Sequence, residues 1–271
     1  MNLKKFYLSI FIITICNGFT LAGGERDLEL GISYYNERYS SAPDYSCNPE
    51  KVDLSIECFE RALKVEETRE KAGEHLLWAY FYKAMFICKD EQAKKENFTR
   101  GRDLGEELIK EFPQNINLKY GYTTNIGKLS EINGLFSSAC QGVAGKIKEN
   151  VEKAMKIDPD YEMGLGYRLK AILYYKAPYI PVILPWANKD EAFEMAELAV
   201  KKWPSSVGNM LTLGELHYWN GDMDKARGIF HSMQTMAPRE NHRTLDNYEI
   251  KKAARYIREI DKDLAQSRAN K

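Results

Sequence analysis

The stretch that decides the fold is VGNMLTLGELHYWNGDMDKARGIFHSMQTMAP, residues 207–238. Its small and apolar residues recur three and four positions apart, which is the period of a helix with one buried face. The centre, Asn220-Gly221-Asp222, is a turn signal, so the stretch predicts two antiparallel helices joined by a tight turn. The residues expected to pack between them are Met210, Leu213, Gly214 and His217 on the first helix and Ala226, Phe230 and Met233 on the second.

The prolines along the chain show that this unit is repeated. Pro238 follows Pro204 by 34 residues, and Pro113, Pro159 and Pro204 are 46 and 45 residues apart. With the packing residues above, the shorter spacing resembles the tetratricopeptide repeat (TPR), a helix pair of 34 residues. The longer units resemble the same repeat with 11 or 12 residues inserted between its helices.

The same register places small or apolar residues at the packing positions of the other units. The second helices carry Ser55, Phe59 and Ala62, then Ile147, Val151 and Ala154, then Ala192, Ala196 and Ala199. The first helices carry Leu76, Leu77 and Tyr80, then Tyr122 and Ile126, then Leu165, Leu169 and Ile172, with Lys119 and Arg168 as polar departures. The expected fold is all-α, a right-handed α-solenoid of about four degenerate TPR-like helix pairs.

The two ends of the chain have different expected roles. Residues 1–22 are typical of an export signal, with two lysines, a short apolar run and small residues near Ala22. Cys16 leaves two alternatives, a lipidated cysteine that anchors the protein or a cysteine discarded with the signal. Residues 23–271 are expected to form one repeat domain that begins near Glu25 and ends in a polar capping helix, residues 245–266.

Composition and motifs argue against several functions. The 39 Lys and Arg balance the 39 Asp and Glu, so no global field favours nucleic acid. The four histidines have no metal-ligand spacing, and no phosphate-binding loop or nucleophile elbow is present. We therefore predict a non-enzymatic protein without metal or cofactor. His217, at a repeat core position, is expected to be a packing residue.

The candidate binding residues lie one place beyond the core positions of the first helices. Such positions line the concave face of a TPR array, and here they are largely aromatic. We expect a partner-binding or ligand-binding groove there, with aromatic core packing as the alternative. The candidate residues of the groove are Trp78, Tyr82, Tyr120, Thr124, Lys170, Tyr174, Glu215 and Tyr218.

The insert of residues 174–187, YYKAPYIPVILPWA, adds Tyr179 and Trp186 to these candidates. Its three prolines rule out a continuous helix, so large apolar side chains stand on a loop. This loop is either a contact surface next to the groove or a plug that fills a gap between helices.

Cysteine positions suggest one cross-link. Cys47, Cys88 and Cys140 fall near connections between first and second helices, while Cys58 lies within a helix. We expect one disulfide at the edge of the array, between Cys47 and Cys88.

The export signal, degenerate repeats and inserts together resemble the T-component proteins (TatT) of tripartite TRAP transporters. Gly166-Tyr167-Arg168-Leu169, the proline-containing insert and Asp190-Glu191-Ala192 are similar as well. The resemblance implies a periplasmic accessory of a solute transporter that self-associates and binds a small apolar ligand, a solute-binding partner protein, or both. It would contact the membrane only through a lipidated Cys16. The alternative is a cell-envelope scaffold that binds a peptide or helix in the concave groove.

Overall fold

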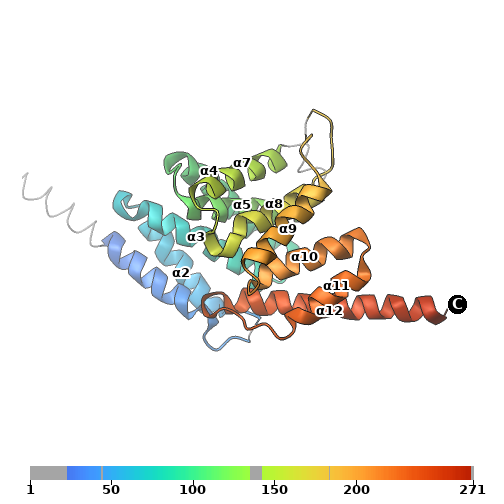
Figure 1. The fold of residues 1–271 in the computed structure, drawn as a ribbon. Coiled ribbons are helices and arrows are strands. Elements are labelled where there is room, and N and C mark those ends of the chain that lie inside the picture. Colours follow the sequence, from blue (N-terminus) through green and yellow to red (C-terminus); the bar gives the residue numbers. More distant parts are fainter. Residues whose placement is uncertain (1–22, 44, 135–141, 183, 270–271) are drawn as a thin grey trace, which may run out of the picture. The chain divides into compact units, whose positions relative to one another are not determined.

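The computed structural model describes residues 23–43, 45–134, 142–182 and 184–269, which form helices joined by turns and loops (Figure 1). No strand occurs within these ranges, and an isolated β-bridge joins Ile180 to Leu184. The expected all-α class is therefore confirmed. The predicted export signal, with Cys16, lies outside the described residues, as does Cys140.

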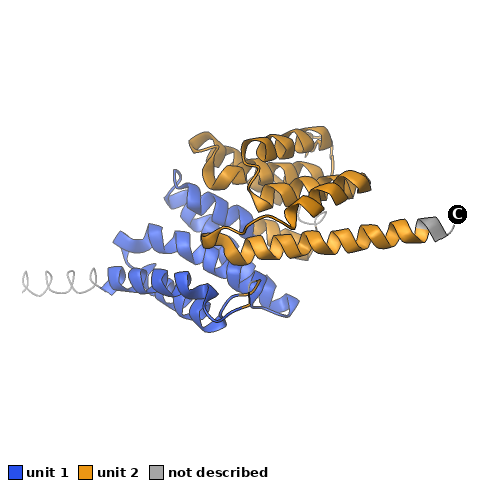
Figure 2. Ribbon diagram, turned by 60° about the horizontal axis from the view of Figure 1, so that its bottom comes forward, with its two compact units in different colours: residues 1–42, 47–125 blue, residues 43–46, 126–271 orange. Residues whose placement is uncertain are grey.

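The contacts divide the chain into two compact units, coloured separately in Figure 2. Unit 1 comprises the chain up to residue 42 and residues 47–125, and unit 2 comprises residues 43–46 and 126–271. The organisation of both units as a single domain stays a prediction.

Unit 1 is a run of helices that pack on their neighbours in sequence. They are a helix over residues 23–36, the 3₁₀ helix η1 (Glu37–Tyr39), α2 (Pro49–Ala62), α3 (Glu66–Phe86), α4 (Glu91–Glu111) and the first part of α5 (Ile116–Asn133). α3 packs against both α2 and α4. Asn48 and Asp90 begin α2 and α4 because their side chains accept hydrogen bonds from the N–H groups of Lys51 and Ala93.

Unit 2 continues the same arrangement. After the end of α5 it contains α7 (Val143–Ile157), α8 (Tyr161–Lys176), α9 (Lys189–Lys202), α10 (Val207–Asn220), α11 (Met223–Met233), the 3₁₀ helix η2 (Glu240–His242) and α12 (Arg243–Ala269). α8 packs against α9 and α10 against α11, so the expected helix pairs are present. α12 contains the expected capping helix and packs against α10 and α11.

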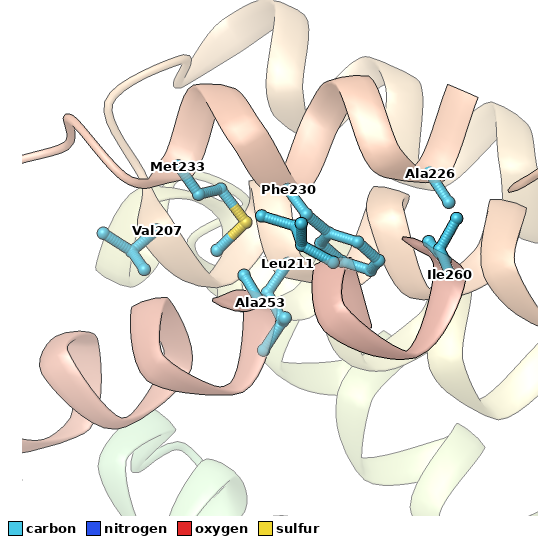
Figure 3. Close-up of a cluster of buried hydrophobic side chains, with 8 residues drawn as sticks. Val207, Leu211, Ala226, Phe230, Met233, Ala253 and Ile260 are labelled. Atoms are coloured by element: carbon cyan, nitrogen blue, oxygen red, sulfur yellow. The ribbon is translucent and has the colours of Figure 1, made fainter. Parts of the chain in front are cut away.

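The stretch at residues 207–238 folds as its pattern predicts. α10 ends at Asn220 and is capped by Gly221, whose φ of 89° is left-handed, a conformation that glycine adopts at low cost. The chain then turns directly into α11. The apolar side chains of both helices meet those of α12, and Figure 3 shows Phe230 and Met233 near Leu211 and Ala253.

Prolines end the second helices where the spacing places them. α4, α7 and α9 each end two residues before Pro113, Pro159 and Pro204, because the residue preceding a proline disfavours helical geometry. The small and apolar residues expected on the second helices are buried: Ser55, Phe59, Ala62, Ile147, Val151, Ala154, Ala192, Ala196 and Ala199. These residues let neighbouring helices approach closely.

The register of α8 differs from the sequence expectation. Glu162, Met163 and Gly164 have positive φ, so regular helix begins only at Leu165. The buried positions of α8 are Gly164, Leu165, Gly166, Ala171 and Tyr174, whereas Leu169 and Ile172 are half-buried.

Candidate functional site

The groove residues expected in unit 1 are packed within it. Tyr82 and Tyr120 are buried, while Trp78 and Thr124 are half-buried. The ring of Tyr82 lies 5.9 Å from that of Tyr35, and its hydroxyl lies 3.4 Å from that of Tyr39. The expectation of an open aromatic groove is therefore corrected for Tyr82 and Tyr120. For Tyr82 the cause is the first helix together with η1, which cover its position.

Two further candidates, Tyr174 and Trp186, pack on each other in unit 2. Their rings are 5.2 Å apart, and Tyr174 is buried, so it too is not part of an open groove. Burial raises the pKa of the Tyr174 hydroxyl. The physical reason for the burial is the insert, which folds back and lays Trp186 over α8.

Lys170 lies beside this aromatic pair. Its Nζ is 5.0 Å from the centre of the Tyr174 ring and 3.6 Å from a carboxylate oxygen of Glu152 on α7. Glu152 also pairs with Lys148, at 2.8 Å, and Lys148 approaches the Trp186 ring. Glu152 is thus shared by two lysines, and the three charges of this cluster sum to +1.

The insert combines the two alternatives that the sequence left open. Leu184 is buried against Ala144 and Leu173, and Trp186 packs on the same cluster, so this half of the loop is a plug. Tyr179 and Val182, in contrast, are 66% and 94% exposed. The loop therefore has an anchored base and an exposed apolar tip. Ile183 lies outside the described residues.

The last two candidates, Glu215 and Tyr218 on α10, contact α12. One carboxylate oxygen of Glu215 lies 2.6 Å from Lys252 Nζ and accepts a hydrogen bond of 2.9 Å from the Tyr256 hydroxyl. The rings of Tyr218 and Tyr256 are 4.6 Å apart. Side chains expected to face a groove are therefore in contact with a helix of the same chain.

A second charged contact joins α12 to α8. Arg168 Nη1 lies 3.8 Å from a carboxylate oxygen of Glu249, and the Arg168 side chain rests on Gly208, where any β-carbon would overlap it. Burial raises the pKa of Glu249, and the nearby Arg168 opposes that shift only in part. Oε2 of Glu249 is buried without a hydrogen-bond partner among the described residues.

We call the side of α8 and α10 that carries Arg168, Gly208, Glu215 and Tyr218 the helix-binding face of unit 2. Sequence reasoning found two of its residues, Glu215 and Tyr218, and noted Arg168 only as a departure from the core pattern. It missed Glu249, Lys252 and Tyr256, because α12 was expected to be a polar cap. An arginine at a core-type position was the signal that a buried anionic partner existed.

The expected disulfide is not formed in the structure. Cys47 and Cys88 are both thiols. The sulfur of Cys88 accepts a weak contact of 3.5 Å from Asn97 on α4, whereas Cys47 lies close to Tyr82. The expected pairing of Cys47 with Cys88 is therefore corrected.

The histidines occupy packing and pairing positions. His217 is buried, with Nδ1 3.1 Å from a carboxylate oxygen of Asp222 and its ring 5.0 Å from that of Phe193. Within the described part of the chain, no three His, Cys, Asp or Glu side chains are grouped as metal ligands. In that same part, no helix is long and apolar enough to cross a membrane.

Comparison with known proteins relates this geometry to one fold. No family model and no curated protein matches the chain. Among solved structures, the chain is similar to a thermophilic TPR protein of Thermus thermophilus, with a TM-score of 0.59 and 16% identity. The match covers 86% of this chain and 98% of that one. The chain thus has the fold of TPR solenoid proteins, which is the fold that its repeat spacing predicts.

Proposed function

We propose that the protein is a non-catalytic scaffold that binds a helical segment of a partner protein on the helix-binding face of unit 2. The observation that carries the proposal is the docking of α12 on that face. A surface that holds one amphipathic helix has the shape and charges to hold another of the same pattern.

The contacts of α12 define the chemistry of such a partner. Its carboxylate at Glu249 meets Arg168, and its ammonium group at Lys252 meets Glu215. Beside this charged edge, Ala253, Ile257 and Ile260 pack into the apolar cluster of α10 and α11. The partner segment is therefore a helix with an acidic residue, a basic residue three positions later, and an apolar stripe one turn wide.

A peptide in trans tests the proposal. Ile257→Asp on α12 places a charge in the apolar cluster and weakens the docking of α12, but leaves every residue of the helix-binding face intact. A fluorescent peptide of residues 243–266 should then bind the full-length variant, as measured by fluorescence anisotropy. The unmodified chain should bind it at least about tenfold more weakly, because its own α12 competes.

Two controls make the result specific. The same peptide carrying Ile257→Asp should not bind, and adding Glu215→Ala to the chain should weaken binding of the unmodified peptide. Circular dichroism confirms that each variant is folded. A folded Ile257→Asp chain that captures no peptide would show that the face serves only as a structural contact.

The narrower proposal is that the scaffold is an exported accessory of a TRAP-type transporter and that its partner is a solute-binding protein. It rests on the resemblance of residues 166–169, the insert and residues 190–192 to T-component proteins. Co-purification with the solute-binding protein of a TRAP system from the same host tests it. The Glu215→Ala variant should reduce that co-purification if the helix-binding face is used. Self-association and lipidation of Cys16 stay predictions.

A further inference from the structure

Glu249 is the poorly bonded charge in the contact between α12 and the rest of unit 2. Its side chain is 12% exposed, and Nη1 of Arg168 lies 3.8 Å from its Oε1, beyond hydrogen-bond distance. Oε2 is buried and has no hydrogen-bond partner among the described residues. Buried carboxylates are usually bonded at both oxygens, so the exception at Glu249 calls for a physical reason.

The site that encloses this carboxylate is built around Gly208 in the first turn of α10. A β-carbon at Gly208 would lie 1.4 Å from Arg168 Nη1 and 3.2 Å from Glu249 Oε2. The glycine therefore allows both side chains to lie against the backbone of α10. This close fit keeps the carboxylate of Glu249 away from water while α12 is docked.

The neighbouring charges do not balance that of Glu249. Asp246, one turn earlier on α12, is fully buried, and its two oxygens accept hydrogen bonds of 2.8–2.9 Å from Arg239. Arg239 is thus engaged by another carboxylate. The charged groups that face Glu249 are Arg168 on α8, Glu215 on α10, Arg239 before η2 and Asp246 on α12. Two guanidinium groups therefore face three carboxylates, Glu249 included.

A second layer of charged groups lies behind the first and engages its other members. Lys252 and Lys128 lie near Glu215, and Glu162 lies beside Arg239 and His242. Among the described ion pairs, Glu249 has only the long one to Arg168.

The ionisation of Glu249 is consequently linked to the docking of α12. Burial raises the pKa of Glu249, Asp246 raises it further, and Arg168 opposes the shift only in part. In an undocked helix the same carboxyl has a pKa of about 4.3. Because the pKa is higher in the docked state, the contribution of Glu249 to docking is complete below about pH 4.3 and is lost as the pH rises through the docked value.

We propose that α12 gates the helix-binding face according to pH: it stays docked while Glu249 is protonated and opens more readily once this carboxyl is ionised. The inference rests on the proposed function, because it concerns the access of a partner helix to the same face. A partner whose acidic residue reaches Arg168 at hydrogen-bond distance does not carry the cost of an unbonded oxygen. Such a partner therefore replaces α12 as the pH rises.

Hydrogen exchange followed by mass spectrometry measures the gate in the full-length chain. Glu249→Gln has the size of the native side chain and stays neutral, so it imitates the protonated form. At about pH 5, amides of residues 243–266 should exchange at equal rates in the two chains, whereas at about pH 8 the unmodified chain should exchange at least about threefold faster. His242 is present in both chains, so its own titration cancels in the comparison.

Glu259→Gln is the matched control, because Glu259 is an exposed carboxylate on the same helix. It should exchange like the unmodified chain at both pH values. Glu249→Gln that exchanges as fast as the unmodified chain at about pH 8, or faster, would overturn the gate, since the ionised carboxylate would then be satisfied by Arg168. Loss of the fold in Glu249→Gln at about pH 5, measured by circular dichroism, would overturn it as well.

Peptide capture separates failure of the gate from failure of the proposed function. If Ile257→Asp captures the peptide of residues 243–266 but the exchange rates of the unmodified and Glu249→Gln chains do not differ, the binding function stands and the gate is wrong. If the exchange rates differ as expected but no peptide is captured at either pH, the pH-dependent docking of α12 stands and the binding function is wrong.

Discussion

Gly214 of α10 lies directly against the ring of Phe230 of α11. A β-carbon built on Gly214 would be 2.8 Å from Cδ1 of that ring and closer still to Cε1. Phe230 is fully buried and stacks on Tyr256 of α12 at a ring distance of 4.9 Å, so it cannot move away freely. This close approach holds the helix pair and α12 around one core.

Gly214→Ala should therefore destabilise the protein by about 1–3 kcal/mol, the usual cost of adding a methyl group to a filled core. Gly228→Ala is the matched control, because a β-carbon there meets nothing within 4 Å. That change should stabilise α11 by about 0.5–1 kcal/mol, since alanine favours helix over glycine. Urea unfolding followed by circular dichroism measures both. Equal changes in the free energy of unfolding for the two variants would contradict the close contact between Gly214 and Phe230.

Trp186→Ala should reduce stability, because Trp186 covers Tyr174 and the cluster around Leu184. Complete removal of a buried tryptophan costs about 3–5 kcal/mol, and for the half-buried Trp186 we expect about 2 kcal/mol. Val182→Ala at the exposed tip should change stability by less than about 0.5 kcal/mol. Thermal unfolding of the two variants, measured in parallel, compares the contribution of the anchoring residue Trp186 with that of Val182 at the tip. A stable Trp186→Ala protein would show that the loop is not anchored by this ring.

We expect strong energetic coupling between Glu215 and its two partners on α12, Lys252 and Tyr256. Glu215→Ala leaves the ammonium group of Lys252 and the hydroxyl of Tyr256 without their partner. Glu215 is buried, but the Lys252 side chain is 29% exposed, so we expect a loss of about 1–3 kcal/mol in the free energy of unfolding. A double-mutant cycle with Lys252→Ala should give a coupling energy above about 1 kcal/mol.

The surface pair of Arg227 and Asp261, which also joins α11 to α12, is the control for that cycle. Both of its side chains are at least 40% exposed. Exposed pairs contribute little, so its coupling energy should be below about 1 kcal/mol. If the two cycles give the same value, the contact at Glu215 is no more than a surface ion pair.

The repeat could be predicted from sequence because its determinants are local. Glycines fix turns, prolines end helices and small residues allow close packing, all within a repeat of about 34 residues. Positions such as Gly221, Pro159 and Ala196 were therefore sufficient to predict the helix pairs. The predicted insert between α8 and α9 was also found, since its prolines cannot continue a helix.

The candidate site could be predicted only in part, because the segments that cover its side chains lie far away in the sequence. A position beside the core stripe is open only if no other segment covers it, and each covering segment comes from elsewhere in the chain. Tyr82 is covered by η1, Tyr174 by Trp186, and Tyr218 by Tyr256 of α12. Helical periodicity contains no information on such contacts between distant segments.

Lowering the pH should reduce the stability of unit 2, because it protonates Glu131 near the end of α5. Its two carboxylate oxygens lie 2.8 Å from Lys128 Nζ and 2.9 Å from Lys176 Nζ. Partial burial opposes the charge of Glu131, but the two ammonium groups outweigh that effect and lower its pKa to about 2. A carboxylate with a lowered pKa stabilises the folded state above its unfolded pKa of about 4.3, and this contribution is lost as the pH falls toward about 2.

Glu131→Gln should consequently reduce the free energy of unfolding at pH 7 by about 1 kcal/mol, a value discounted for solvent screening of a side chain that is 36% exposed. The difference from the unmodified protein should shrink as the pH falls below about 4 and vanish near pH 2. Glu149→Gln is the control, because Glu149 pairs only with Lys153 on an exposed surface among the described ion pairs. Urea titrations at a series of pH values measure the effect. A deficit in Glu131→Gln that is independent of pH would show that the carboxylate acts through packing and not through its charge.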